Sequence, residues 1–122
     1  MSNYKDLDIY KISLEFFYIA HPASLKLPKY ELYELGSQLR RSSDSVVTYI
    51  VEGYGRNRYK AEFVRFLTFS WSSCLETVNH LEKINHLYCG TIENLEDLIS
   101  KYNELSAKIF NFIKYVEQNW KT

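Results

Sequence analysis

The sequence predicts an all-α fold, an up-and-down antiparallel four-helix bundle. Apolar residues recur at helical spacings over four long stretches, and no stretch shows the alternation of a half-buried strand. Glycine, proline and capping residues fall between these stretches. A chain of 122 residues with 46% hydrophobic residues is long enough for one well-developed core. We therefore expect a single domain over residues 1–122.

The first helix is expected from about Tyr4 to His21. Its apolar residues form two stripes, so that more than one side is apolar: Leu7, Tyr10, Leu14 and Phe17, and Ile9, Ile12, Phe16 and Ile19. The residue before a proline is biased away from the helical conformation, so this helix should stop before Pro22. Residues 22–28 are then the longest expected loop.

The second helix is expected to start near residues 28–31. Its apolar residues follow the helical repeat: Leu32, Leu35, Leu39, Val46 and Ile50. Small side chains that let a neighbouring helix approach closely lie between them: Ser42, Ser43 and Ser45. We expect Gly53 and Gly55 to end this helix, because glycine readily takes the left-handed conformation found at helix C-termini.

The third and fourth helices follow after short connections. Asn57 is the expected N-cap of the third helix, which should run to about Tyr88 and stop at Gly90. Thr91 is the expected cap of the fourth helix. The core positions of these two helices repeat at helical spacing: Phe63, Phe66, Leu67, Trp71, Leu75, Val78, Leu81 and Ile84, and Leu95, Leu98, Tyr102, Leu105, Ile109, Phe112 and Val116. Short connections make neighbouring helices antiparallel, which predicts the bundle.

Two sequence blocks carry a family resemblance. They read QLRRSSDSVVTYIVEGYGR over residues 38–56 and FVRFLTFSWSSCLE over residues 63–76, and the chain opens with YKDLDIYKISLEFF. Together these blocks resemble the 23S rRNA intervening-sequence protein family of four-helix bundles, and the glycine–arginine turn after Glu52 is the most specific element. The resemblance implies structural roles for the residues of the motif: Gln38, Glu52, Gly53, Gly55, Phe63, Phe66, Leu67 and Glu76.

The resemblance also implies an assembly and a setting. It implies a small bacterial protein that forms a ring-shaped homopentamer around a central channel. Related proteins accompany the reverse transcriptases of diversity-generating retroelements, where a basic surface is implicated in nucleic-acid binding. This chain departs from the family pattern at Val47, where the family usually has proline, and at Tyr49, where it usually has asparagine. The channel lining of the family is therefore not carried over to this segment.

Charge is unevenly distributed, although the formal net charge is zero. The candidate nucleic-acid contacts are basic residues that can bind phosphates and tyrosines that can stack on bases: Arg40, Arg41, Arg56, Arg58, Lys60 and Arg65, with Tyr54 and Tyr59. In the alternative interpretation, Arg40 and Arg41 pair with Asp44, Glu52 or Glu76 inside the bundle or between subunits. Only ordinary solvated charges then remain.

Neither a metal site nor an enzyme is indicated. The pairs Glu76–His80 and Glu82–His86 are four residues apart on one helix, whereas di-metal bundles use glutamate and histidine three apart on two helices. We therefore expect both histidines at the surface or in an interface. Cys74 falls among core positions, and Cys89 adjoins Gly90. No nucleotide loop and no nucleophile–base arrangement is evident, so no cofactor and no catalytic residue is expected.

Two functional hypotheses remain. The first is a non-enzymatic, homo-oligomeric scaffold that binds RNA or DNA through the basic turn between the second and third helices. The second is a protein-interaction adaptor for a nucleic-acid enzyme such as a reverse transcriptase, with no direct contact to nucleic acid. No apolar run approaches the roughly 20 residues that span a bilayer, and no signal peptide is evident, so a reduced cytoplasmic protein is expected.

Overall fold

The computed structural model describes residues 3–121 and confirms the all-α, four-helix architecture. The helices are α1 (Asp8–Ser24), α2 (Leu35–Gly55), α3 (Lys60–Leu87) and α4 (Leu95–Asn119), with short 3-10 helices η1 (Tyr4–Asp6) and η2 (Lys29–Glu31). Residues 3–121 contain no strand. None of the described helices is long and apolar enough to cross a membrane.

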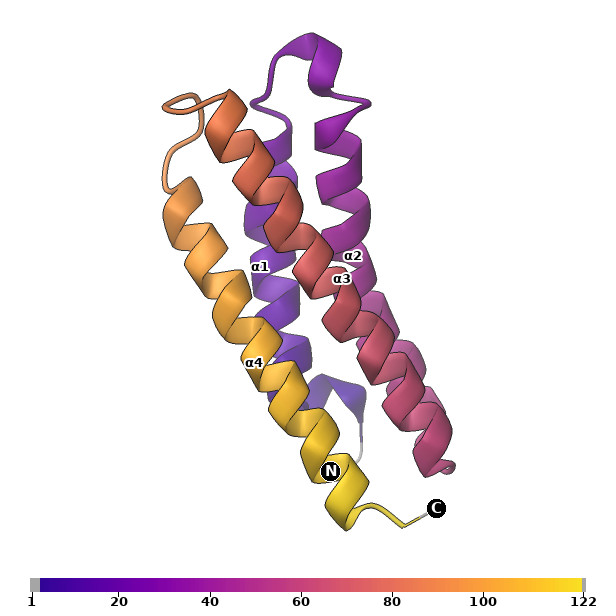
Figure 1. Ribbon diagram of the computed structural model, residues 1–122. Helices are drawn as coiled ribbons and strands as arrows, with labels where there is room; N and C mark the ends of the chain where they lie inside the picture. Colours follow the sequence, from indigo (N-terminus) through magenta and orange to yellow (C-terminus); the bar gives the residue numbers. More distant parts are fainter. Residues whose placement is uncertain (1–2, 122) are drawn as a thin grey trace.

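Consecutive helices lie side by side in opposite directions, so the bundle has two distinct ends (Figure 1). At one end, which we call the loop end, lie the α1–α2 connection (residues 25–34) and the α3–α4 connection (residues 88–94). At the other, the turn end, the α2–α3 turn (residues 56–59) lies near the last turns of α4. Two connections therefore lie at the loop end, whereas the turn end contains one connection and the C-terminal end of α4.

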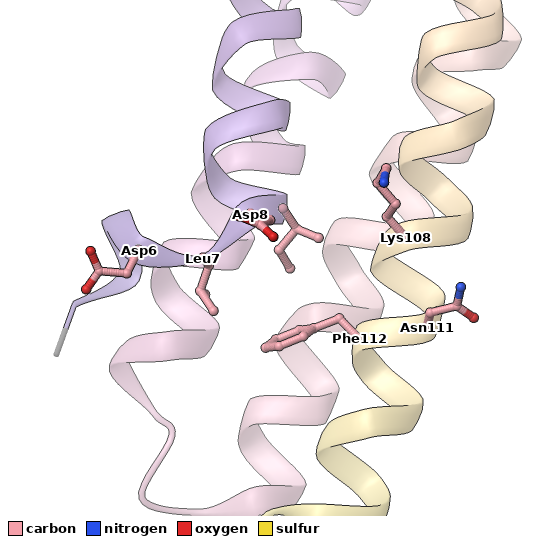
Figure 2. A pocket seen from close by; sticks show the side chains of 7 residues that line it. Asp6, Leu7, Asp8, Lys108, Asn111 and Phe112 are labelled. Carbon is pink, nitrogen blue, oxygen red and sulfur yellow. The ribbon is translucent and has the colours of Figure 1, made fainter. Parts of the chain in front are cut away.

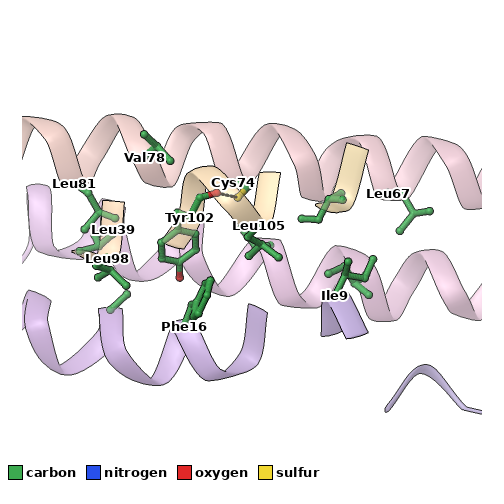
Figure 3. Close-up of a cluster of buried hydrophobic side chains, with 14 of the residues drawn as sticks. Ile9, Phe16, Leu39, Leu67, Cys74, Val78, Leu81, Leu98, Tyr102 and Leu105 are labelled. Atoms are coloured by element: carbon green, nitrogen blue, oxygen red, sulfur yellow. Dashed lines mark hydrogen bonds between the residues drawn. The ribbon is translucent and has the colours of Figure 1, made fainter. Parts of the chain in front are cut away.

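All four helices contribute to one continuous core. The stripe predicted for α4 is confirmed, since Tyr102 and its helical neighbours are buried and Phe112 packs against them. The Tyr102 ring meets Phe16 of α1 edge to face at 5.4 Å, and the Cys74 thiol of α3 donates to the Tyr102 carbonyl oxygen at 3.3 Å (Figure 3). Burial raises the pKa of Cys74 to about 12, so this thiol is inert, as its core position predicts.

Two predicted core residues lie at the surface. Ile19 is 39% exposed and Leu75 is 43% exposed. On α1, the side that contains Ile9 and Phe16 faces the core, together with the small residues Ser13 and Ala20. A helix that is apolar on two sides does not itself show which side turns inward, and here α1 buries the side with small residues.

The predicted boundaries of the first two helices are wrong in detail. α1 continues through Pro22, which lies in its last turn, where the missing N–H removes only the helical hydrogen bond to the carbonyl of Tyr18. α2 begins at Leu35 rather than near residues 28–31. The Leu32 carbonyl accepts a hydrogen bond from the Arg40 guanidinium instead of a helical N–H.

The two glycines near the end of α2 do not adopt the expected left-handed conformation. Within residues 3–121, only Gly90 and Asn94 have positive φ, at 84° and 60°. Gly53 instead permits close packing, because a Cβ at that position would lie 3.1 Å from the Phe66 Cβ on α3. Gly90 does end the α3 region with φ in the left-handed range, as predicted.

The predicted N-caps of α3 and α4 are also wrong. The N-cap of α3 is Tyr59 and that of α4 is Asn94, and neither makes a side-chain capping bond. The Asn57 carbonyl accepts a hydrogen bond from Trp120 of the α4 end, so tertiary contacts fix the backbone here. The expectation of close approach at the serines of α2 is met at Ser42, whose Oγ accepts from Thr77 of α3 at 2.9 Å.

Candidate nucleic-acid interface

The α2–α3 turn is compact and folded on its own backbone. The Arg56 amide donates to the Gly53 carbonyl, the Asn57 amide to the Tyr54 carbonyl, and the Tyr59 amide to the Arg56 carbonyl, each at 3.0 Å. We call residues 56–60 the basic turn. Three successive hydrogen bonds hold its backbone, so its side chains project from a defined scaffold.

The C-terminal part of α4 is hydrogen-bonded to the basic turn. Lys60 Nζ donates to the Glu117 carbonyl at 2.9 Å, and Trp120 Nε1 donates to the Asn57 carbonyl at 2.8 Å. The last turn of α4 contains no basic residue of its own, so Lys60 supplies the positive charge that the carbonyl end of a helix favours. Lys60 therefore has a structural contact in addition to its predicted role.

The core of the bundle at the turn end is made of aromatic side chains. Phe63 is fully buried, and three rings surround it with centroid distances of 5.2 Å to Trp120, 6.0 Å to Phe112 and 6.1 Å to Tyr54. Tyr54 is thus half-buried against Phe63, which limits its predicted use as a stacking surface. Tyr59 is the opposite case, because 58% of it is exposed.

Two arginine side chains of the turn face solvent. Arg58 is exposed and forms no hydrogen bond or ion pair with any residue in the described part of the chain. Arg56 is also exposed, but Nη1 donates to the Glu52 carbonyl at 2.9 Å. The site therefore offers one unconstrained cation and one that is held in place.

Next to the basic turn, α2 and α3 form an aromatic surface that the sequence patterns did not identify. Tyr49, Phe66 and Phe69, which we call the aromatic platform, are half-buried with ring centroids 5.4–6.3 Å apart. The Arg56 guanidinium carbon lies 4.0 Å from the Phe66 ring centroid, and that of Arg65 lies 5.2 Å from the Phe69 ring centroid. Both are cation–π contacts.

The platform depends on the alignment of two helices. Tyr49 and Arg56 are seven residues apart on α2, and Arg65 and Phe69 are four apart on α3. Each pair therefore shares a helix face, a signal that is present in the sequence. The sequence does not show that the two faces adjoin.

Arg40 and Arg41 do not belong to this site. They precede Arg56 by at least fifteen residues of α2, a rise of about 22 Å along the helix. Arg40 is half-buried, with Nη1 donating to Ser24 Oγ at 2.9 Å and Nη2 to the Leu32 carbonyl at 2.6 Å. Its partners are thus a hydroxyl and a carbonyl, in place of the carboxylates considered in the alternative interpretation.

Arg41 lies instead on the side of the bundle, at a polar crevice between α2 and α3. The crevice is about 350 Å³ in volume and also contains two other motif residues, Gln38 and Glu76. Glu76 is 3.1 Å from His80 Nε2, and His80 is only 4% exposed, which corrects the expectation of a surface histidine. His80 Nδ1 has no partner among the described residues. His86 is exposed, as expected.

A larger cavity, about 400 Å³ in volume, lies between the start of α1 and the middle of α4. Its inner wall is apolar, and Leu7 and Phe112 point toward one another there (Figure 2). Asp8 and Lys108 bring opposite charges to its sides. This arrangement supplies no nucleophile paired with a base. The described residues contain no group of three or more histidine, cysteine, aspartate or glutamate side chains that would hold a metal ion.

The sequence matches a known family over most of its length. The family model described as 23S rRNA-intervening sequence protein covers residues 5–111. This range contains α1, α2, α3 and more than half of α4, together with the basic turn and the aromatic platform. No curated protein matches the chain.

Proposed function

This chain belongs to the 23S rRNA-intervening sequence protein family, and on that premise we propose that it is a non-enzymatic, homo-oligomeric scaffold that binds RNA or DNA through the basic turn. The family name alone does not make ribosomal RNA the ligand. Support for nucleic-acid binding comes from the geometry of the turn end, and support for assembly comes from the family.

One observation carries the proposal: exposed cations and an exposed ring occur together on a rigid turn. Arg58 forms no ion pair with any of residues 3–121, and Arg56 is exposed beside it. Tyr59 lies between Arg58 and Lys60 in sequence and is 58% exposed. Arginine N–H groups bind phosphate oxygens in pairs, and an exposed tyrosine stacks on an unpaired base.

A homopentamer is part of the proposal. A ring of bundles repeats each basic turn around one axis, which multiplies the phosphate contacts that a single turn can make. Several large apolar side chains are exposed on this chain and are suited to contacts between copies: Tyr18, Leu25, Leu75, Leu87, Phe110 and Tyr115. The assembly acts in the cytoplasm, where nucleic acid is accessible.

The test is the solution mass of the purified protein, by light scattering, alone and with a structured RNA fragment or a DNA fragment, at low and moderate salt. We expect a pentamer that takes up RNA at low salt and releases it as salt rises, because each neutralised phosphate releases counterions. A pentamer that takes up no RNA or DNA would refute the nucleic-acid role and leave the fold intact.

Arg58 provides the sharper variant, because its replacement breaks no hydrogen bond or ion pair within the described chain. Arg58→Gln should lower affinity and reduce the slope of log affinity against log salt by about one for each phosphate that is no longer neutralised. Lys83→Gln is the matched control, since Lys83 is an exposed cation of α3 beyond the basic turn. Equal losses of affinity from both variants would show a non-localised charge effect and would contradict an interface at the basic turn.

The second candidate, an adaptor for a reverse transcriptase, is favoured by exposed tyrosines at the loop end. Tyr30 is 73% exposed and Tyr33 is 81% exposed, both on the α1–α2 connection. Tyrosine is enriched at protein interfaces and in their hot spots. Binding of a purified retroelement reverse transcriptase that is insensitive to salt and is abolished in Tyr30→Ser/Tyr33→Ser would support the adaptor. Binding that Arg58→Gln abolishes would support the basic turn.

A further inference from the structure

We propose that the aromatic platform, with Arg56 and Arg65 lying on it, selects unpaired strands of nucleic acid by stacking on exposed bases. This inference rests on the proposed function and specifies its ligand: single-stranded RNA or DNA, with little dependence on sequence. Stacking on aromatic rings and guanidinium planes tolerates sequence because every base has a flat face.

The Arg56 side chain is held against the aromatic platform. Its guanidinium carbon is 4.0 Å from the Phe66 ring centroid, and Nη1 is bonded to the Glu52 carbonyl. The side chain is nevertheless exposed, so the guanidinium lies over the ring and is also accessible from solvent. A guanidinium held over a ring in this way is suited to stacking, because little conformational entropy is lost when a base binds.

The platform is large enough for several bases. Arg65 lies over Phe69 and, at 5.7 Å, over Phe66, so the two arginines bracket the rings. Tyr49, which stands where the family usually has asparagine, is 5.4 Å from Phe69 and extends the surface along α2. Tyr49 and Arg56 are seven residues apart, about 10 Å along the helix, which matches about three stacked bases at 3.4 Å spacing.

The charge of the platform distinguishes it from the basic turn. Arg65 lies 3.4 Å from Glu62 on the same helix, and Glu52, one helical turn before Arg56, is exposed. The platform therefore has little net charge and contributes little phosphate attraction. Its contribution to binding is stacking, which salt affects weakly, whereas the contribution of Arg58 is electrostatic.

Because the platform stacks on bases and the basic turn contacts phosphates, single-stranded and double-stranded nucleic acids should bind differently. A duplex offers phosphates to the basic turn, but its bases are stacked on one another and expose only their edges in the grooves. An unpaired strand offers phosphates and base faces together. The basic turn and the aromatic platform adjoin at Arg56, which is part of the turn and lies over Phe66 of the platform. One unpaired strand can therefore contact both surfaces.

The experiment measures the affinity of the purified full chain for a single-stranded oligothymidine and for a hairpin duplex with the same number of phosphates. Fluorescence anisotropy at several salt concentrations gives the affinity and the salt slope for each. We expect the single strand to bind about tenfold or more tightly than the duplex, a factor typical of base–aromatic stacking.

Two variants test the platform and one serves as control. Arg56→Lys keeps the charge and loses the planar fork, and Phe69→Leu removes a ring while keeping an apolar side chain. Each should weaken single-strand binding about tenfold, leaving the salt slope and the duplex affinity unchanged. Phe17→Leu is the matched control, because Phe17 is likewise half-buried and its ring lies 5.6 Å from that of His21 on α1, which is not part of the platform, and it should change neither ligand's binding.

Several results would overturn the inference. Equal affinity for strand and duplex, with no effect of Arg56→Lys, would remove the platform and leave the basic turn as the binding site. Platform variants that alter the solution mass without altering affinity would assign the platform to contacts between copies. Binding of neither ligand would refute the proposed function as well. Should Phe69→Leu fail to fold, as judged by helical circular dichroism, Arg56→Lys decides alone, since Arg56 is exposed.

Discussion

The two ends of the bundle are closed by different kinds of interaction. At the turn end, Phe63 and Trp120 form part of a buried aromatic cluster, and the arginines lie outside it. At the loop end, polar side chains make the connections: Arg40 bonds the Leu32 carbonyl, and the Tyr88 hydroxyl donates to Glu31. Both Nη atoms of Arg40 donate within the protein, so Arg40 is structural. Arg56 donates from Nη1 to a backbone carbonyl but lies exposed over a ring, so its other N–H groups remain accessible to a ligand.

The largest loss of folding stability is expected from a change in the aromatic cluster around Phe63. Phe63→Ala should lower the free energy of unfolding by about 3–5 kcal/mol, because it empties a fully buried site among Tyr54, Phe112 and Trp120. Urea denaturation followed by circular dichroism measures this. A loss of stability smaller than that of any loop-end variant would contradict the view that rings close the turn end.

The second-largest loss of folding stability is expected from a change at Arg40. Arg40→Met keeps the aliphatic stem but leaves the Leu32 carbonyl and Ser24 without their donor, so unfolding should become easier by about 2 kcal/mol. Arg41→Met is the control, with an expected change within about 0.5 kcal/mol, since Arg41 is exposed. Equal effects of the two variants in urea denaturation would refute the structural assignment of Arg40.

A smaller effect is expected at Trp120. Trp120→Phe retains a ring against Phe63 but removes the Nε1 donor to the Asn57 carbonyl, which should cost about 1 kcal/mol. Hydrogen exchange measured by mass spectrometry should show faster exchange in residues 56–60 and unchanged exchange in the α1–α2 connection. Faster exchange at both ends would show that the ends are not closed independently.

The smallest effect is expected at Tyr88, and it depends on pH. The hydrogen bond to Glu31, and then that with Tyr30, raise the pKa of the Tyr88 hydroxyl above its usual value. A raised folded-state pKa means that the stabilisation is complete below the unfolded pKa of about 10 and declines as pH rises above it. The difference in stability between the wild type and Tyr88→Phe should therefore be constant at neutral pH and shrink above about pH 10.

Urea denaturation at several pH values tests this expectation, and Tyr33→Phe is the control because Tyr33 is 81% exposed. A wild-type advantage that persists unchanged into strong alkali would show that the Tyr88 hydroxyl is not the stabilising group.

Helix existence could be predicted because it depends on local periodicity. Leu39, Val46 and Ile50 follow the helical repeat and are fully buried, and Gly90 takes positive φ at the end of α3. Helix ends were less predictable because distant residues determine them. Asn57 is a good local cap, but its carbonyl bonds a tryptophan 63 residues away, and α3 begins later.

The candidate site was predictable only in part, for the same reason. Arg40 and Arg41 are adjacent and alike in sequence, yet within residues 3–121 only the Arg40 side chain forms hydrogen bonds, to partners 8 and 16 residues away in and next to the α1–α2 connection. The platform also depends on register, since Tyr49 and Phe69 meet only when α2 and α3 are aligned. Charge clustering identified the basic turn, because residues that are close in sequence need no tertiary contact to act together.

The anchoring of the basic turn by α4 has a consequence for biosynthesis. A chain that grows from its N-terminus completes residues 56–60 early, but Lys60 and Asn57 receive their partners, Glu117 and Trp120, only after about 60 further residues have been translated. Until then the nascent turn has only its own backbone hydrogen bonds. The turn is therefore anchored only after α4 has been translated and has docked against it.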